Sequence, residues 1–466
     1  MSVNRVLALS AAVLLILSAA FSLSAFNGAF CSTDADGFDP SERSAGNFDL
    51  PVPSAAEKPD DLDELSFSVD IININADKLP ETLAAVSGDV FWRSFADRFG
   101  EDKLSSVASA AEETKGRLTD DDFIALTGYS PKAAVKLLSG DISDVTVIED
   151  CGEEAEIVFV GDTAFVDGWS LMRRYNSRKK GVDGIVSSEI LDIMRSADIT
   201  MANNEFVMSE RGTPIPGKRY TLRGKPEYVS ILLDMGIDIV GMANNHAFDY
   251  GEDALTDTIA TLESAGIRHV GAGEDLSGAT APYYYVIGGR LVSFVASSTV
   301  DVRYTRAATV SQSGVFRDDG LSLSPVITAR EKEIADIVIV FMHWGTESTT
   351  VLSDTQKILG KALVDAGADL VIGMHSHCMQ GVEYYKGKMI AYSLGNFTFS
   401  NFKLTAGLVK TVIGNDGTLT NKYFTLIHEN NYTVINSGSE GKNQLERLRR
   451  ISVNAVIDDD FTVRPK

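Results

Sequence analysis

Side chains of the types that bind metals and transfer protons follow one short apolar run between Gly236 and Gly251. The run from Ile237 to Gly241 is interrupted only by Asp238 and predicts a buried strand. The polar residues at its carboxyl end are Asn244, Asn245, His246 and Asp249. In an open α/β sheet, groups at the carboxyl ends of strands face the crevice where ligands bind. One interpretation is therefore a metal site with a proton donor, and the other is a polar turn that bonds to its own backbone.

The same arrangement follows four further apolar runs. Residues 157–160, 199–202, 337–342 and 370–374 each predict a strand. The residues that follow them are Asp162; Asn203, Asn204 and Glu205; His343; and His375 with His377. Four of the six histidines in the chain therefore follow predicted strands directly, which favours one joint metal site. The other two, His269 and His428, lack this setting and are interpreted as surface or packing residues.

The candidate ligands mix oxygen and nitrogen and include no thiolate, which disfavours a closed structural zinc site. They fit one or two divalent ions of manganese, iron or zinc in an open site, with Glu205 or Asp162 as a bridging carboxylate. His375 and His377 are the most specific pair, because alternate positions on an extended segment can send both imidazoles to the same centre. His246, held by Asp249, would protonate a leaving group or stabilise charge.

A basic loop indicates an anionic substrate. Residues 211–225, RGTPIPGKRYTLRGK, carry five cations and no acidic residue. Arg223 is our candidate for binding a carboxylate or phosphate, and Asn244 is a second candidate for substrate binding. A solvated basic loop without a ligand is the alternative interpretation.

The elements that must position these residues alternate between strands and helices from about residue 155, which predicts a layered α/β domain. Helices are predicted over 226–235, 252–265 and 356–366, each followed by a glycine. Two hairpin turns are predicted, at Gly288-Gly289 and at Lys386-Gly387. Before this domain, residues 66–150 predict a small accessory region in which Thr119 and Ser130 open helices.

The charge of the chain is concentrated near its amino terminus. Of the net −23, residues 32–157 hold 29 acidic and 10 basic side chains, while residues 158–466 hold 36 and 31. This distribution argues against a nucleic-acid partner. Residues 31–65 are interpreted as an acidic linker. The three cysteines, Cys31, Cys151 and Cys378, exclude a disulfide framework, and no bridge between the last two is expected.

The first 30 residues predict a signal peptide or membrane anchor. Arg5 precedes an uncharged stretch from Val6 to Phe26, which has the order of a secretory signal and the length of a membrane span. We therefore expect an extracytoplasmic protein that is either membrane-anchored or secreted.

Eight segments in order between residues 155 and 400 resemble the CapA family of capsule-biosynthesis or poly-γ-glutamate-synthesis proteins. They are GD (161–162), ANNE (202–205), LRGKPE (222–227), MANNHAFDYG (242–251), GAGED (271–275), HWGTE (343–347), GMHSHCMQGVEYYKGK (373–388) and YSLGNFTFS (392–400). The corresponding domain is placed at 155–435, with a tail at 436–466 that contains a basic helix near 445–450.

That family is similar to calcineurin-like metallophosphoesterases, which implies a four-layer sandwich of two sheets between helices. The metal ligands that the resemblance implies are Asp162, Glu205, Asn245, His343, His375 and His377. It also implies that His246 and Asp249 form the acid or electrostatic pair. The phosphoesterases usually open with Asp-x-His, whereas Asp162 is followed here by Thr163 and Ala164, so one ligand is missing or replaced. Ser376 stands where the family usually has proline.

The resemblance implies a role in making, exporting or anchoring an extracellular anionic polymer such as poly-γ-glutamate, through a metal-dependent hydrolase or transferase site. The alternative is a non-catalytic, membrane-tethered polymer-binding subunit of a capsule synthase complex. An intracellular phosphatase is disfavoured by the apolar amino terminus.

Overall fold

The computed structural model describes residues 76–466, apart from 115–116, 140–142, 150, 152–153, 178–180, 302 and 400–402. The predicted leader and acidic linker lie outside the described residues. Within the described part of the chain, no helix is both long and apolar enough to cross a membrane.

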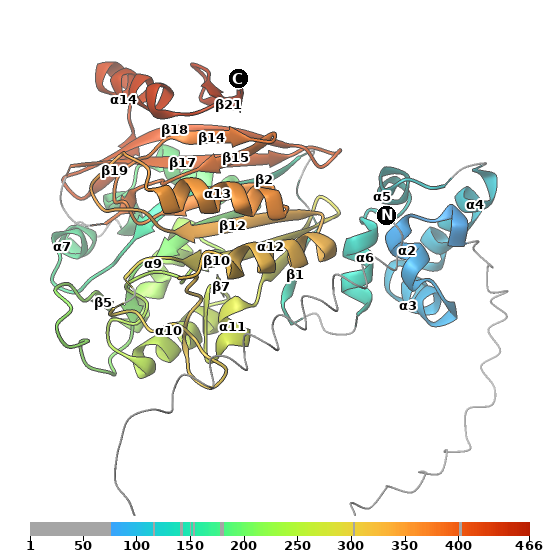
Figure 1. Ribbon diagram of the computed structural model, residues 1–466, viewed down its shortest axis with the longest axis horizontal. Helices are drawn as coiled ribbons and strands as arrows, with labels where there is room; N and C mark the ends of the chain where they lie inside the picture. Colours follow the sequence, from blue (N-terminus) through green and yellow to red (C-terminus); the bar gives the residue numbers. More distant parts are fainter. Residues whose placement is uncertain are drawn as a thin grey trace, which may run out of the picture. The chain divides into compact units, whose positions relative to one another are not determined.

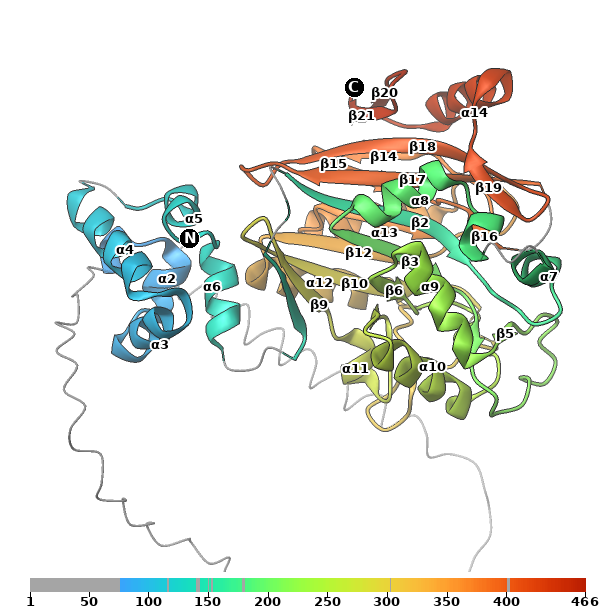
Figure 2. The same ribbon diagram turned by 180° about the vertical axis from the view of Figure 1, so that it is seen from behind.

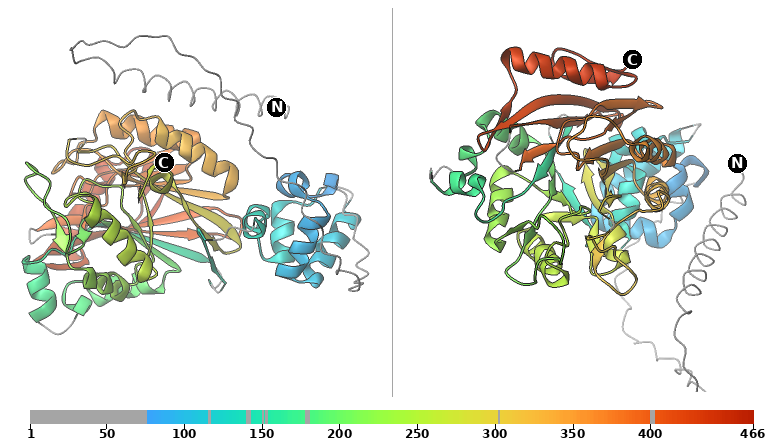
Figure 3. Two further views of the ribbon diagram at one scale, coloured as in Figure 1. Left: turned by 90° about the horizontal axis from the view of Figure 1, so that it is seen from below. Right: turned by 60° about the vertical axis from the view of Figure 1, so that its left-hand side comes forward.

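The accessory region is a cluster of short helices with its own apolar core (Figure 3). After a short 3-10 turn, η1 (Ala76–Lys78), its helices are α2 (Glu81–Val86), α3 (Asp89–Phe99), α4 (Glu101–Glu113), α5 (Asp120–Thr127) and α6 (Pro131–Leu138). Both predicted helix starts are confirmed. The Thr119 hydroxyl accepts from the Asp122 amide in a capping box, and the Ser130 hydroxyl accepts from the Ala133 amide.

Helix α6 joins this region to the rest of the chain. Ala133 and Leu137 pack in the same apolar cluster as Tyr284 and Val286. The Lys132 ammonium also donates to the backbone carbonyls of Lys332 and Ala335, at 2.9 and 2.8 Å. The contact therefore combines apolar burial with direct hydrogen bonds.

The α/β domain contains two large sheets (Figure 1). The first runs in the order β1 (Val145–Ile148), β9 (Tyr283–Ile287), β10 (Arg290–Ser298), β12 (Ile337–His343), β13 (Leu370–Met374), β15 (Lys388–Ala391) and β14 (Val382–Tyr385). The second runs in the order β20 (Ala455–Ile457), β21 (Thr462–Pro465), β18 (Leu419–Glu429), β17 (Leu404–Ile413), β2 (Ala155–Thr163), β3 (Ile199–Asn204), β6 (Ile239–Gly241) and β7 (Arg268–Val270). In addition, β16 (Asn396–Thr398) pairs with β2, and β19 (Tyr432–Ile435) pairs with β18. Both sheets have parallel centres, from β10 to β15 and from β2 to β7.

Four short strands form two small ladders beside these sheets. They are β4 (Val207–Met208) with β5 (Arg223–Gly224), and β8 (Ala272–Gly273) with β11 (Gly314–Val315). The β4–β5 ladder closes the base of the basic loop between them.

The sheets pack face to face and helices cover their outer faces, as the four-layer prediction requires (Figure 2). Phe159 and Met201 of the second sheet share an apolar cluster with Phe294 and Ile339 of the first. Strand β2 is apolar on both faces because Phe159 faces the other sheet while its neighbour Val158 faces the helices. The helices of the α/β domain are α7 (Ser170–Ser177), η2 (Gly181–Gly184), α8 (Ser188–Ser196), η3 (Pro226–Tyr228), α9 (Val229–Met235), α10 (Glu252–Ser264), α11 (Leu276–Thr280), α12 (Leu323–Ile334), α13 (Asp354–Ala366) and α14 (Gly438–Ile451).

Several helices and hairpins end where local residue patterns predicted. Helices α9 and α13 stop at Gly236 and Gly367, whose φ angles of 78° and 115° are left-handed. The Gly288-Gly289 turn joins β9 to β10, and Lys386-Gly387 joins β14 to β15, as predicted. The predicted basic helix near the carboxyl end is α14, and β21 pairs with β18 within the second sheet.

Candidate metal centre

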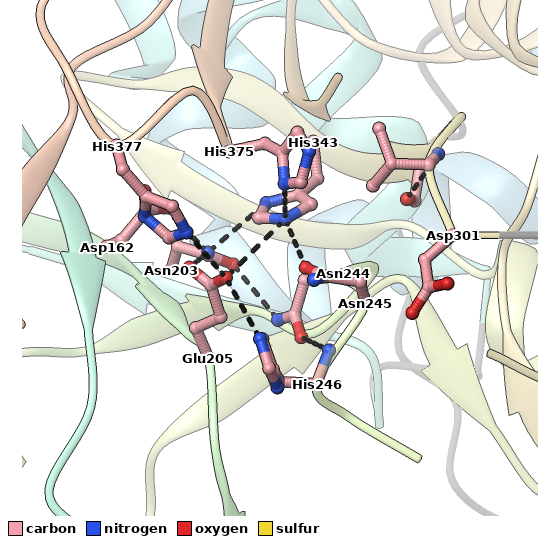
Figure 4. A network of polar contacts seen from close by, with 12 residues as sticks. Asp162, Asn203, Glu205, Asn244, Asn245, His246, Asp301, His343, His375 and His377 are labelled. Carbon is pink, nitrogen blue, oxygen red and sulfur yellow. Dashed lines mark hydrogen bonds and ion pairs between the residues drawn. The ribbon is translucent and has the colours of Figure 1, made fainter. Parts of the chain in front are cut away.

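The centre lies where strands from both sheets end (Figure 4). In the second sheet, Asp162 lies on β2, Glu205 follows β3, and Asn245 and His246 follow β6. In the first sheet, His343 ends β12, and His375 and His377 follow β13. The structure thus brings together all six side chains that were predicted as metal ligands. Parallel strands that present their carboxyl ends at one edge account for this convergence.

Two overlapping groups of side chains have ligand geometry. One comprises Glu205, His343 and His375, and the other comprises Asp162, Glu205 and His377. Within each group, the ligand atoms lie within 4.8 Å of one another. Glu205 belongs to both groups, so it is the carboxylate that both groups would share if two ions bind.

Asn245 completes the first group. Its Oδ1 lies 2.8 Å from His343 Nε2, and His375 Nδ1 lies 3.1 Å from the same nitrogen. An amide oxygen and two imidazole nitrogens therefore converge on one point beside Glu205.

Unsatisfied oxygen atoms provide a test of whether these residues fit a metal. Asp162 Oδ2 and Glu205 Oε1 are buried and have no hydrogen-bond partner among the described residues. Such atoms are costly in a protein interior unless a donor or a cation compensates them. The mixed oxygen and nitrogen donors suit a divalent ion, so the residues fit the group that the fold implies.

The electrostatics of the centre agree with this fit. Burial, together with the negative charge of Asp162, raises the pKa of Glu205 well above its ordinary value. Burial and the neighbouring histidines lower the pKa of His343 well below its ordinary value, and burial lowers that of His375 to about 3. Both imidazoles are therefore neutral at physiological pH, the form that binds metals.

The His375-Ser376-His377 segment is not extended, contrary to the expectation from alternate spacing. His375 and His377 have φ angles of 89° and 54°, in the left-handed region that favours glycine. The turn still directs both imidazoles to the centre, and His377 Nδ1 lies 3.5 Å from Asp162 Oδ2. Strained backbone of this kind is typical of functional sites.

Two asparagines support the ligands: Asn203 was predicted to follow a strand but had no assigned role, and Asn396 was missed. Asn203 Nδ2 donates to Asp162 Oδ1 at 2.8 Å and to Glu205 Oε2 at 3.2 Å. Asn396 Oδ1 lies 2.7 Å from His377 Nδ1. Asn203 stood in the ANNE segment and Asn396 in the YSLGNFTFS segment, so their membership of these segments was the available signal.

His246 is held as a proton donor beside the centre. Its Nδ1 lies 2.7 Å from Asp249 Oδ2, and its Nε2 lies 4.0 Å from Glu205 Oε1. Asp249 also accepts from the Leu222 amide and pairs with the Lys218 ammonium at 2.8 Å. Because the Asp249 carboxylate only accepts, Nδ1 of His246 carries a proton and donates it in a hydrogen bond to Asp249, and Nε2 faces the centre.

A cavity of about 290 Å³ adjoins the centre. Asn245, His246 and His375 line it on the side of the centre. Its other lining residues are Lys218, Arg219, Tyr220, Asp301, Tyr304 and Glu347. Ligands would therefore approach the centre past a wall that carries both signs of charge.

The two residues predicted to bind substrate do not line this cavity. The Arg223 guanidinium donates to the backbone carbonyls of Arg211 and Gly212 and lies over the ring of Tyr250, 3.5 Å from its centroid. The buried Asn244 side chain donates to Asn203 Oδ1 and Asn204 O and accepts from the His246 amide. Both side chains are committed to shaping loops, and Lys218 and Arg219 are the basic-loop residues at the cavity.

The remaining histidines and cysteines have the surroundings that the sequence suggested. His269 Nε2 lies 3.3 Å from the Glu263 carboxylate with its side chain only 16% exposed, and His428 is buried against Thr433. Cys151 and Cys378 are free thiols.

The fold and the centre define a class: a four-layer α/β protein with a carboxylate- and histidine-rich site at the strand ends. The chain belongs to the family described as bacterial capsule synthesis protein PGA_cap, which matches residues 156–401. That range contains every residue of the candidate centre.

Curated relatives carry names from the same field. The PGA biosynthesis protein CapA of Bacillus subtilis is 34% identical over 246 residues, which cover 52% of this chain and 62% of that protein. The capsule biosynthesis protein CapA of Bacillus anthracis is 34% identical over 184 residues, 39% and 45% of the two chains. A probable polyglutamine synthesis accessory protein of Mycobacterium tuberculosis is 32% identical over 211 residues, 43% and 55%. The matches thus span less than two thirds of each of these relatives.

A solved structure, the NAD nucleotidase NadN of Haemophilus influenzae, is similar with a TM-score of 0.34 and 11% identity. The likeness covers 66% of this chain and 57% of that one. It is too distant to support an inference about function.

Proposed function

We propose that this chain is an accessory protein of capsule or poly-γ-glutamate biosynthesis with a metal-dependent hydrolase or transferase site. Family membership and the names of the relatives support the pathway. The observation that carries the chemistry is the sharing of Glu205 by two ligand groups that contain unsatisfied buried oxygens. The substrate would be an anionic polymer such as poly-γ-glutamate, and its reacting bond an amide.

In this proposal, Asp162, Glu205 and His377 hold one divalent ion. Glu205, Asn245, His343 and His375 hold a second. Ions in such a site polarise a carbonyl oxygen and make a bound water more acidic. Manganese, iron and zinc all suit these ligands.

The residues of the chain supply the remaining steps. His246 in its doubly protonated form would give the Nε2 proton to the departing nitrogen, while Asp249 fixes the ring through Nδ1. Asn203 would keep the Asp162 and Glu205 carboxylates in place through its two hydrogen bonds. Tyr220 and Tyr304 would narrow the approach to the reacting bond.

We also propose that the domain acts outside the cytoplasm, attached to the membrane or released by cleavage of the leader. The uncharged stretch from Val6 to Phe26 supports this location. Protease treatment of intact cells that express the full chain would test it, since an exported domain is digested and a cytoplasmic one is protected.

A second candidate function is polymer binding without catalysis, as a subunit that works beside membrane-bound capsule synthase proteins. The missing histidine after Asp162 favours it, because Ala164 stands where the phosphoesterases have a ligand. In that case the centre would serve only to hold the polymer.

Polymer length distinguishes the two functions. The full chain, supplied with Mn²⁺, is incubated with poly-γ-glutamate, and the molar mass of the polymer is followed by light scattering. The proposal predicts that the polymer is shortened, or that its length distribution changes when an amine acceptor is added. Neither change should occur with a chelator or in His246→Ala. His269→Ala is the matched control and keeps the activity. Polymer that binds but keeps its length would favour the second function.

A further inference from the structure

Most of the charge that lines the cavity is already neutralised within the protein. The Lys218 side chain is 7% exposed, and its ammonium pairs with Asp249 at 2.8 Å and Asp301 at 3.1 Å and donates to the Asn245 carbonyl. Asp249 in turn holds His246. Lys218 and Asp301 are therefore committed to holding the loop of the centre and are not free to bind a ligand.

Two charged residues of the cavity wall are left without a partner. Arg219 makes no hydrogen bond or ion pair with any described residue, and its guanidinium only stacks on the ring of Tyr220, 5.0 Å from the centroid. Glu347 likewise has no such partner among the described residues. Both side chains are exposed to solvent. The wall thus offers a ligand one free positive and one free negative charge.

This pairing identifies a chemical class of ligand. A phosphate group would be attracted to Arg219 but repelled by Glu347, because like charges in proximity disfavour binding. An inner residue of a γ-linked glutamyl chain carries an α-carboxylate but no ammonium. The residue at the amino end carries both groups on one carbon, and only this residue matches both free charges.

We propose that the cavity binds the amino-terminal residue of a γ-linked glutamyl chain, with Arg219 on its α-carboxylate and Glu347 on its α-ammonium. This inference rests on the proposed function and adds that the site recognises a chain end. The volume of about 290 Å³ is at the small end of ligand sites, which suits a terminal residue better than a long stretch of polymer.

Recognition of the end determines the product. Water adds its oxygen to the carbon of the first γ-amide, the carbon–nitrogen bond breaks, and the departing nitrogen takes a proton. Each turnover would release one glutamate from the amino end.

Binding of small peptides to the full chain tests the inference without any turnover. The probes are γ-glutamyl-glutamate, its N-acetyl derivative and α-glutamyl-glutamate, compared by titration calorimetry without added metal. The N-acetyl form lacks the ammonium, and the α-linked form lacks a free α-carboxylate on the amino-terminal residue. We expect the free γ-linked peptide to bind about fivefold more tightly than the N-acetyl or the α-linked peptide, because one exposed charge pair typically changes affinity by about that factor.

Variants assign the two contacts. Glu347→Gln should abolish the tighter binding of the free amine. Arg219→Gln should weaken the binding of the free and the N-acetylated γ-linked forms by the same factor. Arg303→Gln is the matched control, since Arg303 stacks on Tyr304 as Arg219 does on Tyr220 but does not line the cavity. Thermal unfolding of each variant checks that it is folded.

The outcomes separate this inference from the proposed function. Equal binding of the free and N-acetylated γ-linked forms to the unaltered protein would overturn end recognition and leave the polymer role standing. A preference that persists in Glu347→Gln would overturn the assignment of Glu347. Failure of every γ-linked probe to bind would contradict both the inference and the proposed polymer.

Discussion

Lys218 is the residue that ties the proton donor to the ligand loop. It contacts Asp249, Asp301 and the Asn245 carbonyl while itself 7% exposed. Lys218→Met would leave the buried Asp249 without its cation, and losing one partner of a buried pair costs about 3–5 kcal/mol. We expect the free energy of unfolding in urea to fall by about that amount in Lys218→Met. In Lys218→Arg most of this stability should be retained, because the arginine keeps the positive charge. A loss below about 0.5 kcal/mol for Lys218→Met would show that the ion pairs are not formed.

His246 should matter for turnover and not for metal binding. It lies 4.0 Å from Glu205 Oε1 but belongs to neither ligand group. We expect His246→Ala to lower kcat on a γ-glutamyl substrate by about 10²–10⁴-fold, the usual contribution of a general acid. Metal content measured on the same sample should be unchanged. Parallel loss of metal would assign His246 to the ligands instead.

At this scale the sequence predicted residue types and positions better than side-chain directions. The candidate metal ligands were singled out because they follow predicted strands, and strand ends can be located from apolar runs. Asn244 was chosen by the same logic and Arg223 for its charge in the basic loop, yet their side chains bond to Asn204 O and Arg211 O. Which way a loop side chain turns depends on tertiary contacts that no local pattern contains.

The strands set the geometry of the centre, and their order in the two sheets explains why the sequence alone did not show which carboxylate the two ligand groups share. Parallel strands with carboxyl ends at one edge were expected, but the ends come from two sheets, with β3 in one and β12 in the other. A pattern of apolar residues indicates that a segment is a strand, but it does not show which strands lie beside it. For that reason the sequence alone left both Glu205 and Asp162 as candidates for the bridge, and the packing of the two sheets brings Glu205 into both groups.

Asp238, immediately before β6, makes the stability of the folded protein depend on pH. Burial raises the pKa of Asp238 to about 6, although its carboxylate accepts from the Thr200 amide at 2.8 Å. The folded protein thus holds the proton of Asp238 more tightly than the unfolded chain, in which the pKa of this carboxyl is near 3.8. Its contribution to stability is present below pH 4 and is lost as the pH rises through 6.

Asp238→Asn should remove that dependence, because the amide keeps an acceptor for Thr200 and cannot ionise. We expect the variant to be more stable than the unaltered protein at pH 7 by on the order of 1–2 kcal/mol, and not at pH 4. Urea unfolding at both pH values measures the difference. Equal stability gains at pH 4 and pH 7 would exclude titration of Asp238 as the cause.

In the molecule as a whole, α6 links the helical accessory region to the α/β domain. Leu137 is 3% exposed and packs in the cluster that contains Tyr284. Leu137→Ala should lower the free energy of unfolding of the α/β domain by about 2–5 kcal/mol, as for other buried leucines. The control Val90→Ala, at a side chain that is 78% exposed, should change it by less than about 0.5 kcal/mol. Equal effects would mean that α6 does not support the domain.

The central claim is that the candidate centre binds divalent metal, and metal content tests it most directly. Elemental analysis compares the full chain with the double variant His375→Ala/His377→Ala, which removes one ligand from each group, and with His269→Ala as the control. One or two equivalents of manganese, iron or zinc are predicted in the unaltered protein and in the control, and none in the double variant. Full metal content in the double variant, or no binding of any of these ions to the unaltered protein, would contradict the account.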